Sequence, residues 1–222
     1  ADAQLANGQP DAARRSLSQA GRLDENPDAY LKRRARIALV QGDRYAALAH
    51  LRRRLSLYPS DGEALWFYAM LVAELDEDSA RATFRRDADQ GMARLHAEAR
   101  PLDFLMASLA MAGEDTGGLR ALGEERDCAE IDDEPSRNNC MAWYAAMAGS
   151  SDDEALALIQ AAVQAKANRA DYLDTLAMVH LVRGELALAA EASLAAAQLS
   201  PDRFYHLWQA ERIRALADAA QD

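Results

Sequence analysis

Two cysteines are the residues of this chain whose chemistry depends most directly on their surroundings. Cys128 and Cys140 are separated by the segment AEIDDEPSRNN. In an oxidising compartment a disulfide across this segment would stabilise the fold by about 3 kcal/mol in the chain-entropy model, whereas a reducing compartment would keep two thiols. The sequence leaves both states open. Zinc is a poor fit, because the spacing is not that of a CxxC pair and no histidine lies nearby.

Carboxylates are concentrated around the same segment, between residues 124 and 134. They are Glu124, Glu125, Asp127, Glu130, Asp132, Asp133 and Glu134. A calcium loop needs alternating oxygen ligands around a glycine turn, which this segment lacks. The sequence therefore predicts a solvated acidic loop and no metal site.

The histidines give no support for catalysis. His50, His96, His180 and His206 are scattered, with no second ligand or nucleophile at a meaningful spacing. The sequence also has no glycine-rich phosphate loop, no nucleophile elbow and no HExxH pair. We therefore expect a protein that is not an enzyme and needs no cofactor.

Composition predicts an all-α fold. Hydrophobic residues make up 50% of the 222 positions, whereas aromatic residues make up only 6% and alanine is abundant. Such a chain suits helices that pack closely through small side chains. It has no apolar stretch of the ~20 residues that a membrane-spanning helix needs, so we expect a segment that is not membrane-embedded.

Net charge restricts the partners. The formal charge of -11 argues against nucleic acid, because affinity for phosphates rests largely on Lys and Arg. An acidic field attracts cationic ligands, so a basic peptide, a basic protein patch or a cationic polymer fits this charge. The same acidity also serves solubility, and the sequence does not separate these two roles.

Apolar, small, glycine and proline residues fall in one ordered series near the carboxyl end. The series is Leu173, Leu176, Ala177, His180, Gly184, Leu186, Ala189, Ser193, Ala196 and Pro201. Apolar residues at helical spacing give one buried face per helix, a glycine ends the first helix, and a proline separates successive hairpins. This pattern resembles the tetratricopeptide (TPR) repeat, and the same template set from Asp28 matches a second time.

The resemblance implies an all-α, TPR-type α-solenoid of antiparallel helix hairpins that form a right-handed superhelix. We place the turns of the successive hairpins at Gly8, Gly42, Asp76, Gly113, Ser150 and Gly184. The predicted single array over residues 1–222 has a partial unit at 1–27, units at about 28–61, 62–98, 99–135, 136–169 and 170–203, and a capping helix at about 201–220. Because only about two turns of helix precede Gly8, we expect the chain to be part of a longer array.

In the TPR family, ligands usually lie in the concave groove lined by the first helix of each unit. Carried over by register, the groove positions are Lys32, Arg36, Trp66, Met70, Asp103, Arg137, Tyr144, Asp174 and Met178. Family members that clamp a peptide carboxylate place a lysine and then an asparagine in their first unit. Here Lys32 is followed by Arg36, so this chain departs from the clamp.

The resemblance therefore implies a protein-protein interaction scaffold. Only two of the 25 basic residues are lysines, a bias typical of GC-rich bacterial genomes. With the acidic charge and a possible disulfide, this suits the periplasmic TPR region of an outer-membrane exopolysaccharide export protein, which would recruit a partner enzyme or guide a cationic polysaccharide during biofilm secretion. The alternative is a cytoplasmic TPR regulatory or sensor module of a larger signalling protein.

Overall fold

The computed structural model describes residues 4, 9–23, 30–58, 61, 63, 64, 67, 68, 71, 116–150, 152–201 and 203–220. Every regular element that these residues form is a helix, so the all-α prediction is confirmed. None of the described helices has the length and apolar character needed to cross a bilayer. The chain divides into two compact units, Ala1–Glu114 and Asp115–Asp222.

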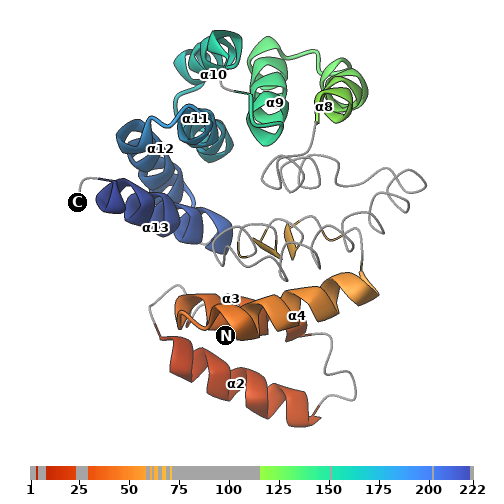
Figure 1. Cartoon of the computed structure of the whole chain (residues 1–222), viewed down its shortest axis with the longest axis vertical. Helices are drawn as coiled ribbons and strands as arrows, with labels where there is room; N and C mark the ends of the chain where they lie inside the picture. Colours follow the sequence, from red (N-terminus) through yellow and green to blue (C-terminus); the bar gives the residue numbers. More distant parts are fainter. Residues whose placement is uncertain are drawn as a thin grey trace. The chain divides into compact units, whose positions relative to one another are not determined.

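The first unit contains a helix pair with one further helix packed on it. Its described helices are α2 (Pro10–Leu23), α3 (Leu31–Val40) and α4 (Arg44–Leu57) (Figure 1). Ala13 and Leu17 of α2 pack against Ile37 of α3, with Tyr30 at the edge of this cluster. Because α3 and α4 are joined by a three-residue turn and pack on each other, they form an antiparallel hairpin.

The second unit is a continuous succession of helices. They are α8 (Gly117–Gly123), the π-helical turn η2 (Glu124–Cys128), α9 (Glu134–Met147), α10 (Asp153–Ala165), α11 (Ala170–Val182), α12 (Leu186–Leu199) and α13 (Phe204–Ala219) (Figure 1). From α9 onward each helix packs on the next one, and α9 also packs on α11. The first helices of successive pairs therefore lie side by side.

Three hairpin turns have the same backbone geometry. Gly42, Gly149 and Gly184 have φ of 73°, 75° and 75°, the left-handed conformation that favours glycine. The residue after each glycine donates its backbone N–H to a carbonyl five residues earlier, at 2.9 Å in all three turns. This is the Schellman hydrogen bond, which satisfies carbonyls left free at the end of a helix. One local device thus ends the first helix of each described pair.

The links that follow the second helices also share one geometry. The residues that cap α4, α10 and α12 at their carboxyl ends are Tyr58, Lys166 and Ser200. Their φ values are -133°, -142° and -139°, and their ψ values are 75°, 73° and 64°. In each case the backbone N–H of the capping residue donates to the carbonyl four residues earlier. Turns and links therefore alternate in a fixed order along the described chain.

One predicted turn lies a residue away from its expected place. The left-handed residue between α9 and α10 is Gly149, not Ser150, because glycine tolerates this conformation without a steric penalty. The buried Ala155 follows Gly149 by six positions, whereas Ala189 follows Gly184 by five. This turn thus holds one extra residue, which shifts the register of α9 by one position relative to α10.

Small side chains fill the spaces between helices. Ala177 of α11 meets Ala189 and Ala192 of α12 in a cluster that also contains Ile213 of α13. All four are buried, and Ala177, Ala189 and Ile213 are 0% exposed. Close approach through methyl groups lets each hairpin bury one face against the next, as the alanine-rich composition predicts.

The turn glycines provide a test of this geometry. Gly184→Ala should destabilise the second unit by about 1 kcal/mol, because the added methyl meets nothing within 4 Å and the cost is the left-handed backbone alone. Gly118 in α8 also has open space around it but an ordinary helical backbone. Gly118→Ala should therefore be neutral or slightly stabilising in chemical denaturation, and equal effects of the two changes would contradict the assignment.

Candidate functional site

The basic pair predicted for the start of the groove is already neutralised within the first unit. Lys32 and Arg36 lie one turn apart on α3, and both contact Glu63, at 2.6 Å and 2.5 Å. Lys32 also reaches Asp61 at 3.4 Å. An acidic ligand would have to compete with these carboxylates. Lys32 and Arg36 therefore lie next to each other, as the register implied, but both belong to an ion-pair network with carboxylates of the same unit.

Asp61 anchors the other side of this network. It accepts a hydrogen bond from Arg54 Nε at 2.8 Å, and the Arg54 guanidinium lies 3.7 Å above the Tyr58 ring. Burial opposes the charge of Asp61, but the hydrogen bond from Arg54, the Lys32 ammonium and the Ala64 N–H together lower its pKa. The network therefore ties the end of α4 to the segment that follows it.

The predicted middle of the groove is outside the part of the chain that can be described. Trp66, Met70 and Asp103 all lie outside the described residues.

In the second unit the predicted groove residues of α9 differ in exposure. Arg137 is half-buried, and its Nη1 donates to the Ile131 carbonyl at 3.0 Å. Tyr144 is only 4% exposed. The one-residue shift of α9 explains this burial, because the position expected for Tyr144 is taken by its neighbour Trp143, which is half-exposed. Choosing Gly149 rather than Ser150 as the turn residue would have found Trp143.

Tyr144 packs against the helical stretch that precedes α9. A Cβ on Gly123 would overlap the Tyr144 ring, so only glycine leaves room for it. The Tyr144 hydroxyl donates to Asp127, which also receives two hydrogen bonds of 2.6 Å from Arg126. The Arg126 guanidinium lowers the pKa of Asp127, and the Tyr144 hydroxyl adds to this shift. Tyr144 is thus a packing residue in this structure.

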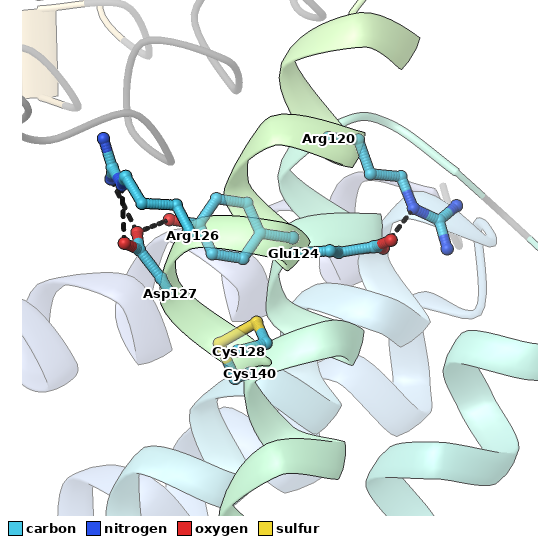
Figure 2. The surroundings of a disulfide bond; sticks show 7 residues. Arg120, Glu124, Arg126, Asp127, Cys128 and Cys140 are labelled. Carbon is cyan, nitrogen blue, oxygen red and sulfur yellow. Dashed lines mark hydrogen bonds and ion pairs between the residues drawn. A yellow bond between two sulfur atoms is a disulfide. The ribbon is translucent and has the colours of Figure 1, made fainter. Parts of the chain in front are cut away.

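A disulfide joins the same two segments. Cys128, the last residue of η2, bonds Cys140 of α9 with a Cα–Cα distance of 5.6 Å (Figure 2). Cys128 is 1% exposed, so one sulfur is sealed inside the unit. Figure 2 shows the Arg126–Asp127 and Arg120–Glu124 pairs on either side of the helix that carries Cys128. Of the two redox states that the sequence left open, the structure holds the disulfide.

The π-helical turn gives the acidic segment its position. The backbone N–H of Ala129 bonds the Glu124 carbonyl, five residues earlier, at 3.1 Å. Glu125, Asp127, Glu130, Asp132 and Asp133 lie exposed beyond or along this turn. Among the described residues, no group of three or more metal-ligating side chains could hold one ion.

The carboxyl-terminal groove residues lie beneath α13. Asp174 and Met178, one turn apart on α11, are 5% and 4% exposed. Gln209 of α13 is 0% exposed and places its Nε2 2.8 Å from the Met178 sulfur. Burial raises the pKa of Asp174 to about 7, the Tyr205 hydroxyl opposes this rise, and the Asp171 charge adds to it.

One pair in the described chain resembles a catalytic dyad in composition. The Ser200 hydroxyl contacts His206 Nδ1, and the same hydroxyl donates to the Ala196 carbonyl at 2.9 Å. A serine that gives its proton to a carbonyl is not activated by the histidine as a base. This arrangement closes the end of α12 and positions the start of α13.

Comparison with known proteins adds no assignment. No protein-family model matches the sequence. No curated protein matches it significantly either.

Gly123 and Tyr144 give a test of the packing at η2. Gly123→Ala should destabilise the second unit by about 2 kcal/mol, since the methyl collides with the Tyr144 ring. In a Tyr144→Ala background the same change should cost nothing or stabilise, because the ring is gone and alanine favours the helix. Equal costs of Gly123→Ala in the two backgrounds would show that the ring does not need this glycine.

The disulfide provides a second stability test. Replacing both cysteines, Cys128→Ser with Cys140→Ser, should lower the free energy of unfolding by about 3 kcal/mol, as the loop-closure model gives for a ring of this length. Denaturation of the wild type with and without a dithiol reductant should show the same difference. If reductant lowers the stability of the double variant as much as that of the wild type, the effect does not come from this bond.

Proposed function

We propose that this chain is a non-enzymatic interaction scaffold built from TPR-type repeats. The observation that carries the proposal is the repeated backbone geometry. Three turns centred on Gly42, Gly149 and Gly184 share one left-handed cap, and three links share a second conformation. A repeated helix-turn-helix unit that buries its face only against its neighbours is the building block of a solenoid.

Contacts between successive helix pairs support the same proposal. Lys32 contacts Glu63, 31 positions later, and Arg120 contacts Asp152, 32 positions later. Ser136 meets Tyr172 across 36 positions, and Gln209 meets Met178 across 31. These separations cluster near the 34 residues of a TPR unit. Corresponding helices of adjacent pairs thus exchange side-chain contacts within each described unit.

In this proposal the first helices of the pairs line a concave groove that holds a partner protein. Trp143 of α9 is the aromatic residue of the second unit that best fits the role, because it occupies the corrected groove position and is half-exposed. Aromatic anchors with partial exposure are common in interaction hot spots. The buried Tyr144 would hold α9 in place through its contacts with Gly123 and Asp127.

Charge narrows the class of partner. The second unit contains 19 Asp and Glu against 9 Lys and Arg, so it carries -10 of the chain's formal charge of -11. The first unit, with 17 acidic and 16 basic residues, is nearly neutral. A cationic partner would therefore be drawn to the second unit. We propose a basic protein surface or a partly deacetylated, cationic polysaccharide.

The disulfide supports an oxidising compartment as the setting. With the lysine-poor, bacterial composition, it favours the periplasm over the cytoplasm and fits the proposed role in exopolysaccharide export. There the scaffold would recruit a modifying enzyme or guide the polymer.

The test is capture from periplasmic and cytoplasmic extracts of a bacterial source, followed by reconstitution with the purified partner. We expect saturable binding to a periplasmic protein that Trp143→Ala weakens about tenfold, as the loss of a hot-spot side chain would. Leu194→Ala, at a 54% exposed position of α12, is the matched control and should leave binding unchanged. Titration with deacetylated and fully acetylated oligosaccharides tests the polymer directly.

Three outcomes would overturn parts of the proposal. Reconstituted binding only to a cytoplasmic protein would replace the export setting with a regulatory module. Equal loss in both variants, or in neither, would remove the groove as the binding surface. Equal binding of charged and neutral oligosaccharides would remove charge as the basis of polymer recognition.

A further inference from the structure

The contact between α11 and α13 contains a seam of buried polar side chains. We define this seam as Asp174 and Met178 of α11 with Tyr205 and Gln209 of α13. The Tyr205 hydroxyl lies near enough to Asp174 to affect its pKa. Gln209 contacts Met178 one turn further along. Because both pairs are 31 positions apart, the two helices run parallel here.

Two acceptor oxygens in the seam are sealed from solvent. Among the described residues no donor reaches Asp174 Oδ1 or Gln209 Oε1. The side chains that carry them lie on facing helices and are 5% and 0% exposed. A buried acceptor without a donor costs free energy, and a buried negative charge costs more. A protonated Asp174 removes the charge and brings one donor into the seam.

We propose that the seam between α11 and α13 is a proton-operated latch, in which a proton on Asp174 holds α13 against α11 and its loss loosens that contact. Because the carboxylate is sealed, a proton is the cation that can neutralise it without opening the helices. The latch is local, since Ile213 holds α13 by a separate apolar cluster with Ala177 and Ala189.

The surroundings of Asp174 favour its neutral form. Burial raises its pKa to about 7, Asp171 on the same helix raises it further, and the Tyr205 hydroxyl opposes the rise. Arg212, farther along α13, lies 5.9 Å from the Trp208 ring. The other helices packed on α11 carry Glu134 and Arg137 (α9), Asp153 and Glu154 (α10) and Glu191 (α12), none of which contributes to this shift.

The sign of the pH effect follows from linkage. The docked state holds the proton more tightly than an undocked state in which Asp174 has its ordinary pKa. Stabilisation of the docked state is therefore complete below pH ~4, falls as pH rises, and is lost above pH ~7. Between pH ~6 and pH ~8 the equilibrium for opening the seam should increase about tenfold.

Loosening the latch also has a consequence for binding, which rests on the proposed function. Asp174 and Met178 are groove positions in the repeat register and lie beneath α13 when the seam is closed. A partner that uses them would bind better at higher pH. The latch itself does not depend on any partner.

Hydrogen exchange of the full-length chain tests the latch without a ligand. Rates of α13 peptides are corrected for the intrinsic pH dependence and compared with α10 peptides. From pH ~6 to pH ~8 the opening of α13 in the wild type, relative to Asp174→Asn, should rise about tenfold. His206 sits beside Tyr205 on α13, with ring centroids 5.4 Å apart, and because it is also present in Asp174→Asn, the comparison removes its contribution.

Two further variants sharpen the test. Asp218→Asn, a change of equal charge at an exposed position of α13, should behave as the wild type does. Tyr205→Phe removes the hydroxyl that favours the carboxylate and should move the transition to higher pH. A ratio of wild type to Asp174→Asn that stays constant with pH, or a response lost equally in Asp218→Asn, would overturn the latch. If the latch fails this test but the partner is still captured at both pH values, the proposed scaffold function holds and only the latch is overturned.

Discussion

Close approach of helices through small side chains is the constraint on which the rest of the structure depends. Ala177, Ala189 and Ala192 leave room for neighbouring backbones, and Ile213 fills the remaining space. Such packing buries little area per residue, so each hairpin must continue its buried face onto the next one. The left-handed glycines matter for the same reason, because they return the chain at the angle that brings two alanine faces together. Among the described residues the buried faces therefore continue from one helix pair to the next.

A larger side chain fits between these helices only where a neighbouring residue leaves space for it. The Tyr144 ring needs the missing Cβ of Gly123, and its hydroxyl needs Asp127. The disulfide then ties η2 to α9 beside that contact. Asp174 differs, since among the described residues no donor reaches its Oδ1. The two interfaces therefore respond to different variables, one to redox conditions and the other to pH.

Charged residues have different roles in the two units. Lys32 and Arg36 satisfy Glu63 inside the first unit, so basic side chains near a predicted groove serve cohesion there. In the second unit the excess acid lies mainly on exposed loops and helix starts, where Asp133 and Asp152 cap α9 and α10. Capping acids stabilise helices through backbone N–H groups and also leave a negative field outside. The same residues can thus stabilise the fold and attract a cationic partner.

The sequence by itself determined the helical class and the turn glycines Gly42 and Gly184, because these follow from local periodicity and backbone preference. It also located Lys32 and Arg36 together, but not the carboxylates that neutralise them. Only the tertiary structure decided that Tyr144, Asp174 and Met178 are buried and that Trp143 is half-exposed. The physical reason is that spacing defines the faces of a helix, whereas burial depends on which neighbour covers each face. A single extra residue in the turn at Gly149 was enough to put Trp143 at the position where the repeat register had placed Tyr144.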